Sequence, residues 1–505
     1  MKTRRVFYNL LCGLFAQIIT IAVGILLPRL VLVSLGSESN GLMNSINQIF
    51  VYFSLLEAGV GSATLQALYG PVGKEDHAST SRILAATDKY YKKTGFLYLA
   101  AFLTLSVVYP LVIETELARS TIFWVVVLTG FSSVISYFFQ GKYNLLLVAE
   151  GKNYIGSNLG TITYILTSIS KIFLLLNGFG VIALQAMHCF FNILRMLYIE
   201  WYIHRHYSWI DLHAEPDYKA IEQKNSVFIH QISGMIFNNT DIVILSLFVG
   251  LKSVSVYSMY MLLFGMVGKL ISTCVGSINF IFGQTFHNDH DYYMKLHNAY
   301  ELYYMALVFS LFCIANIFIL PFIKLYTRGV TDIEYIDHFL PVLFISYYLL
   351  HYSRDSSGMV IQFAGHFKQN ISKAILESAI NLTVSIIGVQ FYGIYGVLFG
   401  TIAALLYRAN DMIIYANKVI LKRSSWKTYR CWITNLLLFI GITWVTKIFL
   451  PAERLDSYAS IILYAVVCCL VIIPVFFAAA SLLDRQSFVL VKSFTINKLK
   501  HLTSK

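Results

Sequence analysis

The sequence predicts an all-α polytopic membrane protein with about 14 transmembrane helices, in two pseudo-symmetric six-helix lobes plus two C-terminal helices. The first observation is composition, because hydrophobic residues make up 57% of the 505-residue chain and charged residues only 13%. The second is that the charges cluster between long apolar runs. The third is an internal duplication, in which residues 30–63 return 212 to 215 positions later.

The predicted helices are the apolar runs long enough to cross a bilayer, which takes about 20 residues. The first run follows Lys2, Arg4 and Arg5 and continues far beyond the apolar core of a signal peptide, so we expect an uncleaved helix. The runs cover residues 6–35, 41–69, 94–113, 121–148, 155–177, 180–203, 226–250, 253–284, 299–326, 336–364, 371–391, 394–416, 431–450 and 458–483.

Three pairs of short segments recur in the same order, which indicates a duplication of six helices. The pairs are Leu30-Val31-Leu32-Val33-Ser34-Leu35 with Ile242-Val243-Ile244-Leu245-Ser246-Leu247, Val60-Gly61-Ser62 with Val275-Gly276-Ser277, and Gly178-Phe179-Gly180-Val181 with Gly393-Ile394-Tyr395-Gly396-Val397. Six crossings return the chain to the same side, so both copies have the same orientation. The predicted domains are an N-terminal lobe at 1–203, a cytoplasmic linker at 204–225, a C-terminal lobe at 226–422, two additional transmembrane helices at 423–484 and a basic cytoplasmic tail at 485–505.

The distribution of charge predicts topology and excludes several classes of protein. Most of the 38 Lys and Arg residues fall in the N-terminal segment, the even-numbered connections and the C-terminal tail, which places both termini in the cytoplasm. The net charge of +12 follows from this topology, and the chain lacks the soluble basic domain that nucleic-acid binding would need. Because no connection can hold a catalytic domain, we expect a transporter rather than an enzyme, with no cofactor and no metal.

Several charged residues lie inside the predicted helices. Each would cost about 2.5 to 3.5 kcal/mol if it faced lipid at mid-membrane, so most must face one another or a hydrated cavity. We expect Arg195 and Arg408 to reach the headgroups, Arg408 to pair with Asp411, and Glu377 to reach water. The full set is Arg29, Glu57, Lys171, Arg195, Asp241, Lys269, Arg354, Asp355, Glu377, Arg408 and Asp411.

The duplication pairs some of these charges. Aligning the two copies places Arg29 opposite Asp241, and Glu57 nearly opposite Lys269 on the second helix of each half. If a pseudo-two-fold axis along the membrane normal relates the halves, equivalent helices flank a shared central space, and rocking the halves opens it alternately to each side. That geometry favours a transporter. The alternative is that these charges only hold the halves together.

Two segments of the chain resemble the signatures of a known family. Leu35-Gly36-Ser37-Glu38-Ser39-Asn40-Gly41-Leu42, and Asp241-Ile242-Val243-Ile244 followed by Gly250 and Val256-Tyr257-Ser258, look like the paired signatures of polysaccharide and lipid-linked oligosaccharide flippases. That Wzx-type family belongs to the multidrug/oligosaccharidyl-lipid/polysaccharide exporter superfamily. The resemblance covers essentially the whole chain.

The resemblance implies a V-shaped pair of six-helix lobes and a function. The family translocates oligosaccharide on an undecaprenyl diphosphate carrier from the cytoplasmic to the outer leaflet of the bacterial cytoplasmic membrane, for capsule, O-antigen or exopolysaccharide assembly. Arg29, Lys269, Arg354 and Lys171 would then bind the substrate, because Arg and Lys bind phosphate. Asp241 and Glu57 would be gate or ion-coupling residues.

Three alternatives stay open on the sequence alone. A cation-coupled drug or metabolite antiporter of the same superfamily shares the fold, but it usually has only twelve helices. An integral glycosyltransferase or polymerase would need a sizeable external loop. A non-transporting membrane scaffold is the third. The expected partners are the lipid-linked oligosaccharide and membrane lipids, with glycan polymerase and glycosyltransferases as further candidates. Basic amphipathic segments at 82–93 and 485–500 are predicted to lie on the inner leaflet.

Overall fold

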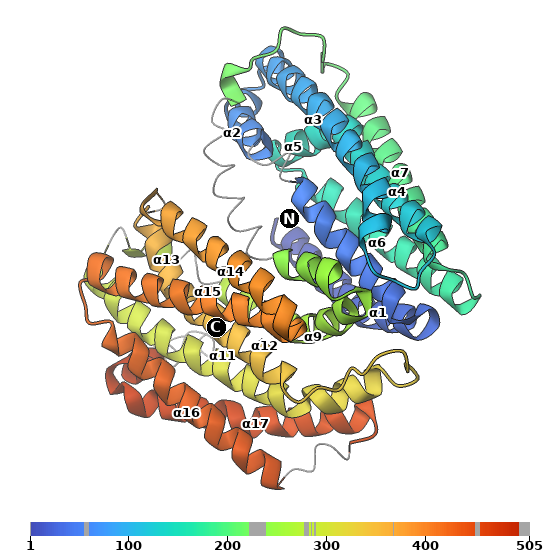
Figure 1. Cartoon of the computed structure of the whole chain (residues 1–505). Coiled ribbons are helices and arrows are strands. Elements are labelled where there is room, and N and C mark those ends of the chain that lie inside the picture. Colours follow the sequence, from blue (N-terminus) through green and yellow to red (C-terminus); the bar gives the residue numbers. More distant parts are fainter. Residues whose placement is uncertain are drawn as a thin grey trace. The chain divides into compact units, whose positions relative to one another are not determined.

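The computed structural model describes residues 2–54, 60–221, 239–276, 282–283, 285–286, 289–366, 368–449 and 455–493. Every long regular element in these ranges is a helix (Figure 1). Nine helices of the described residues are long and apolar enough to cross a membrane. The prediction of an all-α polytopic membrane protein is therefore confirmed, while the count of fourteen crossings stays a prediction.

The first two apolar runs meet at a sharp kink, where one helix ends and the next begins. Helix α1 (Lys2–Phe53) contains a single non-helical residue, Gly36, with φ 80° and ψ 174°. Only glycine populates that region readily, because a side chain there collides with its own backbone. The backbone therefore kinks at Gly36, and helical geometry resumes directly after this residue. Helix α2 (Val60–Gly73) follows within the second predicted run.

The next helices match the predicted runs closely, except that the first of them begins at His77, well before the run at 94–113, and so includes the segment at 82–93. They are α3 (His77–Val112), α4 (Arg119–Ile135), α5 (Gly141–Ala149), α6 (Asn153–Leu176) and α7 (Val181–His206). A π-helical turn, η2 (Ser136–Gln140), joins α4 to α5, so that together they cover the run at 121–148. The side chain of Asp76 caps α3 by accepting a hydrogen bond from the N–H of Ser79 at 3.0 Å.

The C-terminal part continues the pattern. A helix at Asn239–Phe248 is followed by α9 (Leu251–Gly276), α11 (His290–Tyr326), α12 (Leu340–Ser353), α13 (Asp355–Phe363), α14 (Ile371–Tyr392), α15 (Ile394–Tyr415), α16 (Trp426–Phe449) and α17 (Tyr458–Leu483). Short helices η3 (Lys219–Ile221), η4 (Lys368–Asn370) and η5 (Ala416–Ile420) lie in connections or at helix ends.

The chain divides into two compact units. The first comprises Met1–Ser255 with Gly329–Ile333, and the second comprises Val256–Arg328 with Glu334–Lys505. The division falls inside α9, so its first turn belongs to the first unit and the rest to the second. The lobes at 1–203 and 226–422 stay a prediction.

Residues 329–333 join the first unit through the bend in α1. Asp332 accepts hydrogen bonds from the backbone N–H of Ser37 at 2.8 Å and from the Ser37 hydroxyl at 2.7 Å. These are the bonds of a helix N-cap, supplied by a side chain far away in sequence. Asp332 therefore caps the helix that restarts after Gly36.

Further bonds hold the restarted helix at the same end of the first unit. The Glu38 carboxylate accepts bonds from the Thr115 hydroxyl at 2.7 Å and the N–H groups of Glu116 and Leu117 at 2.9 and 3.1 Å. The Asn40 amide donates to the Ser255 hydroxyl at 2.7 Å. The segment at 35–42 therefore connects the restarted helix to the residues around it.

Aromatic stacking fixes α12 within the second unit. Phe344 stacks between Tyr260 and Phe264 of α9, with ring centroids 5.7 and 6.0 Å apart. Tyr348, one turn further along α12, stacks on Phe312 of α11 at 5.3 Å. Each such pair adds about 0.5 to 1.5 kcal/mol beyond the apolar area it buries. The first half of the predicted helix at 336–364 is therefore rigidly placed before the chain reaches Arg354.

Candidate functional site

A break at Arg354 interrupts the predicted helix at 336–364. The segment Ser353-Arg354-Asp355-Ser356-Ser357-Gly358 is polar or small throughout, in the middle of an apolar run. Helix α12 ends at Ser353 and α13 begins at Asp355, so the two helices meet at Arg354. Broken helices inside a membrane expose backbone and side-chain polar groups to a cavity. Arg354 is thus placed where a membrane protein can bind a polar ligand.

Contacts with α11 hold the start of α13 in place. The Tyr304 hydroxyl donates to the Asp355 carboxylate at 2.9 Å, and the Ser356 hydroxyl donates to Glu301 at 3.3 Å. Asp355 lies in the first turn of α13, where a negative charge is favourable. These bonds fix the direction in which the break faces.

Five charged residues form a chain of alternating sign beside the break. Arg354, between α12 and α13, pairs with one oxygen of Glu377 on α14, and Arg408 of α15 lies 3.4 Å from the other. Arg408 also pairs with Asp411 at 2.7 Å, and Asp411 pairs with Lys373 at 2.7 Å. With three cations and two carboxylates, this network has a net charge of +1. Two arginines therefore converge on a single carboxylate.

A cavity of about 460 Å³ opens against this network. It is large enough for a small polar ligand or the charged part of a larger one. Its lining comes from α13, α14 and α15 with the break itself. The residues are Arg354, Asp355, Gly358, Met359, Gln362, Glu377, Arg408 and Met412.

A second group of cations lies between α6 and α7 in the first unit. Lys171 is buried, with 8% of its surface exposed. The Arg195 guanidinium lies over Gly160, at about 3.7 Å from where a Cβ would stand there. In the part of the chain that the structure describes, no carboxylate pairs with Lys171 or Arg195. This face therefore carries uncompensated positive charge.

The other predicted site residues occupy varied environments. Arg29 is half-buried in α1, and Asp241 is buried in the helix at Asn239–Phe248. Lys269 is exposed on α9 in the second unit, and Glu57 lies outside the described residues. The pairing of Arg29 with Asp241 and of Glu57 with Lys269 stays a prediction.

Comparison with known proteins identifies the fold. No family model matches the sequence, and no curated protein matches it significantly. An inward-facing multidrug resistance MATE family transporter of the MOP superfamily aligns with a TM-score of 0.65 and 15% identity, over 80% of this chain and 95% of its own. The lipid II flippase MurJ, in an inward closed conformation, aligns with a TM-score of 0.69 and 13% identity, over 92% of this chain and 98% of its own. The MATE multidrug transporter DinF-BH aligns with a TM-score of 0.56 and 12% identity, over 80% and 93%.

This chain has the same fold as these MATE transporters, one of which is named as a MOP-superfamily member, and as MurJ. That finding agrees with the superfamily expected from the signature segments, and the matched proteins are transporters and a flippase by name. At 12 to 15% identity the likeness concerns the fold, so the roles of individual residues in this MOP-fold chain rest on its own geometry.

The position of Arg408 in the candidate site differs from the one that the sequence predicts. The sequence predicts that Arg408 reaches the headgroups and that Glu377 reaches water, but only 7% and 6% of their surfaces are exposed. The expectation for Arg408 is wrong, because its guanidinium pairs with Glu377 and Asp411 instead. Glu377 lines the cavity, and its access to water stays a prediction. The expected pair of Arg408 with Asp411 is confirmed. The spacing of Arg408 and Asp411, and the charge of Arg354 within an apolar run, are signals in the sequence that point to the network.

Proposed function

We propose that this protein is a flippase that translocates undecaprenyl-diphosphate-linked oligosaccharide from the cytoplasmic to the outer leaflet of a bacterial cytoplasmic membrane. The glycan would serve capsule, O-antigen or exopolysaccharide assembly, and both termini would be cytoplasmic. The observation that carries the proposal is the convergence of Arg354 and Arg408 on Glu377 beside a cavity of about 460 Å³. The MOP-superfamily fold supports alternating access as the mechanism.

The arrangement suits an anion that enters and leaves. Glu377 is the shared partner of two arginines, and its carboxylate occupies a place that a phosphate oxygen can also fill. Arginine binds carboxylate and phosphate through the same planar fork of donors. A diphosphate carries more charge than one carboxylate, so it can displace Glu377 as the common partner of Arg354 and Arg408. Exchange of partners would keep both arginines paired throughout the cycle, and the released Glu377 carboxylate would face the open cavity that it lines.

The extent of the structural match favours a lipid-linked substrate. MurJ, named as a lipid II flippase, aligns over 92% of this chain, whereas the MATE transporter aligns over 80%. The difference is 12% of 505 residues, or about sixty residues, which is the size of the two additional helices at 423–484. Flipping also needs a polar cavity for the head group while the polyprenyl tail stays in lipid.

The deciding experiment measures which leaflet holds the glycan. Purified protein is reconstituted into vesicles with undecaprenyl-diphosphate-linked oligosaccharide, and a soluble lectin reports glycan accessibility over time. We expect Arg354→Gln and Arg408→Gln each to slow flipping about tenfold or more, because each removes a charge-assisted bond to phosphate. Arg119→Gln is the matched control, since Arg119 is exposed at the start of α4. Normal flipping by both cavity variants would refute the proposed site.

The other residues that the sequence predicts for the site would also take part in transport. Arg29, Lys269 and Lys171 would bind the substrate on its path, and Asp241 and Glu57 would act as gate or ion-coupling carboxylates. If Arg29 and Asp241 pair during the cycle, exchanging them as Arg29→Asp with Asp241→Arg should recover more flipping than either single change. Failure of the exchange, in protein that inserts normally, would remove that pair from the mechanism.

A cation-coupled antiporter is the second candidate function. The observation that favours it is that the carboxylates Asp355, Glu377 and Asp411 gather at or beside one cavity in the membrane region, as cation coupling requires. An imposed sodium or proton gradient should then drive export of a cationic dye from the same vesicles. Dye export without glycan flipping would make the antiporter the better assignment. Loss of stability alone in the variants would indicate a scaffold.

A further inference from the structure

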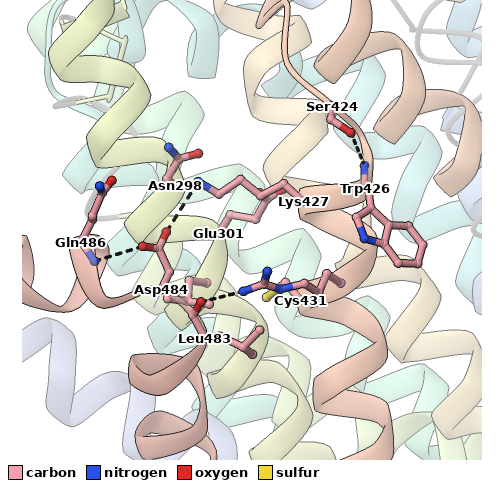
Figure 2. Close-up of a pocket in the computed structure, with 11 residues that line it drawn as sticks. Asn298, Glu301, Ser424, Trp426, Lys427, Cys431, Leu483, Asp484 and Gln486 are labelled. Carbon is pink, nitrogen blue, oxygen red and sulfur yellow. Dashed lines mark hydrogen bonds and ion pairs between the residues drawn. The ribbon is translucent and has the colours of Figure 1, made fainter.

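A second cavity, of about 410 Å³, lies beside the ends of the three helices α11, α16 and α17 (Figure 2). It is formed by the N-terminal part of α11, the first turns of α16 and the C-terminal end of α17 with the residues just after it. It shares no lining residue with the cavity at Arg354. Its lining residues are Asn298, Glu301, Leu302, Ser424, Trp426, Lys427, Arg430, Cys431, Leu483, Asp484 and Gln486.

Glu301, one of the two acidic residues that line this cavity, already has hydrogen-bond and ion-pair partners within the protein. One Glu301 oxygen accepts a bond from the Thr428 hydroxyl at 2.8 Å, and the other pairs with Arg423 at 2.6 Å. Glu301 is also buried, with 3% of its surface exposed. Its charge is therefore compensated from inside the helix packing and is not directed at a ligand.

Protein groups also satisfy the second acid, Asp484. Asp484 caps the helix at 485–493, because its carboxylate accepts bonds from the N–H groups of Gln486 and Ser487 at 3.1 and 3.3 Å and from the Ser487 hydroxyl at 3.0 Å. Lys427 approaches it at 3.5 Å (Figure 2). Both carboxylates are thus parts of the local structure.

The two cationic side chains at the cavity, Lys427 and Arg430, have hydrogen-bond donors that could bind a ligand. Within the described residues, the Arg430 side chain makes one bond, from Nη2 to the Leu483 carbonyl at 2.7 Å, out of five possible donors. Lys427 makes only the long contact to Asp484 with its side chain, out of three donors. Both side chains are exposed to the cavity mouth. The unused bonding capacity of this cavity is therefore cationic and suits an anion.

The surroundings place this cavity at a membrane surface. Trp426, at the start of α16, is 63% exposed, and tryptophan prefers the headgroup level of a bilayer. The helix at 485–493 comes directly after Asp484 and exposes Phe488 and Val489 along with Arg485 and Lys492. Such a basic amphipathic helix lies in the plane of the headgroups. The cavity mouth therefore meets phospholipid headgroups.

We propose that this cavity binds the phosphate of a phospholipid headgroup through Lys427 and Arg430. Trp426 flanks the glycerol region of the same lipid, and the acyl chains lie along the apolar surface of α16. This site is separate from the transport cavity and independent of what the protein transports. A bound lipid would tie α16 and α17 to the leaflet beside them.

The test measures lipid binding to the full-length protein directly. Delipidated protein in a neutral detergent is titrated with short-chain phosphatidylglycerol, and bound lipid is counted by native mass spectrometry. We expect Lys427→Gln to weaken binding about tenfold, and Arg430→Gln to do the same. Lys447→Gln, at the opposite end of α16, is the matched control and should bind as the unmodified protein does.

Two results would overturn the proposal. One is unchanged lipid binding by Lys427→Gln, a variant that loses only the long contact to Asp484 and is therefore expected to keep its melting temperature. The other is equal binding of inorganic phosphate with the same dependence on Lys427, which would identify a site for free phosphate. A flippase assay on the same variants is a separate readout, because normal flipping with lost lipid binding still supports this site.

Discussion

In the proposed mechanism, Glu377 serves both the folded state and the transport cycle. It is the shared partner of two arginines in a region where isolated charges are costly. The same carboxylate is the group that an incoming anion would replace. Stability in the absence of ligand and affinity for a ligand are therefore coupled at this position.

Replacing Glu377 by Gln tests that coupling. We expect the variant to lose about 3 to 5 kcal/mol of stability, because Arg354 and Arg408 lose their common counter-charge. Added pyrophosphate should then raise the melting temperature of Glu377→Gln more than that of the unmodified protein, as measured by thermal unfolding in detergent. Glu334→Gln, an exposed carboxylate, is the control. Equal shifts in all three proteins would show that the arginines do not bind the anion.

Asp332 and Ser37 offer a second test at the level of single residues. Asp332→Ala removes two hydrogen bonds to Ser37, and we expect a loss of about 1 to 3 kcal/mol. Ser37→Ala removes only the hydroxyl bond, so it should cost less. A double-mutant cycle from chemical unfolding curves should give a favourable coupling energy. Additive effects would mean that the two side chains do not interact.

Adding a side chain at Gly41 should cause a steric clash. A Cβ at Gly41 would overlap the Leu251 carbonyl at the start of α9, which is backbone and cannot rotate away. We expect Gly41→Ala to reduce the yield of folded protein sharply, as judged by size-exclusion chromatography. Gly441→Ala is the matched control, because nothing lies within 4 Å of a Cβ there. That control should be neutral or stabilising by up to about 1 kcal/mol.

At the scale of helices, the sequence predicts where helices lie better than how they meet. Apolar length predicts α3, α6, α7, α14, α15, α16 and α17 within a few residues, apart from the extra N-terminal turns of α3, because the bilayer sets helix length. Arg354 is predicted as a site residue because a charge in an apolar run is costly. The burial of Glu377 and Arg408 is not predicted, because it depends on how α14 and α15 pack against a broken neighbour. The cap of Ser37 by Asp332 is likewise invisible to local sequence patterns.

The contact between α14 and α15 depends on small residues. A Cβ at Gly396 would overlap the backbone of Gly388, and one at Gly400 would overlap the Ser385 side chain. Small residues at such spacings let transmembrane helices approach closely. Because Glu377 and Arg408 lie on these two helices, the same contact sets their separation.

Widening this contact should disrupt the charged network. We expect Gly400→Val to lower thermal stability and to separate Glu377 from Arg408, which would reduce flipping even though no charge has changed. Leu406→Ala is the control on the same helix, since Leu406 is 48% exposed. Full activity of Gly400→Val at normal stability would show that the spacing of α14 and α15 does not matter.

At the scale of the whole molecule, α9 is shared by both compact units. Asn40 and Ser255 are hydrogen-bonded within the first unit, directly before the division at Val256. Their separation of 215 positions equals the spacing of the duplicated segments. The first turn of α9 therefore belongs to the same compact unit as the bend of α1.

A covalent link between these positions tests that assignment. Joining Asn40→Cys to Ser255→Cys with a short bifunctional thiol reagent should leave flipping unchanged, because both residues belong to one unit. The single-cysteine variants treated in the same way control for the native cysteines. Arrest by the link, reversed with a cleavable reagent, would show that Asn40 and Ser255 separate during the cycle.

The cap on Ser37 also has a consequence for biosynthesis. Asp332 lies 295 positions after Ser37, so the ribosome must make that much more chain before the bend in α1 can be capped. At about 5 to 20 residues per second, this delay is roughly 15 to 60 seconds. During that time the early helices are already entering the bilayer with the N–H and hydroxyl of Ser37 still uncapped. Membrane insertion of this chain therefore precedes completion of its first compact unit, and Gly329–Ile333 complete it.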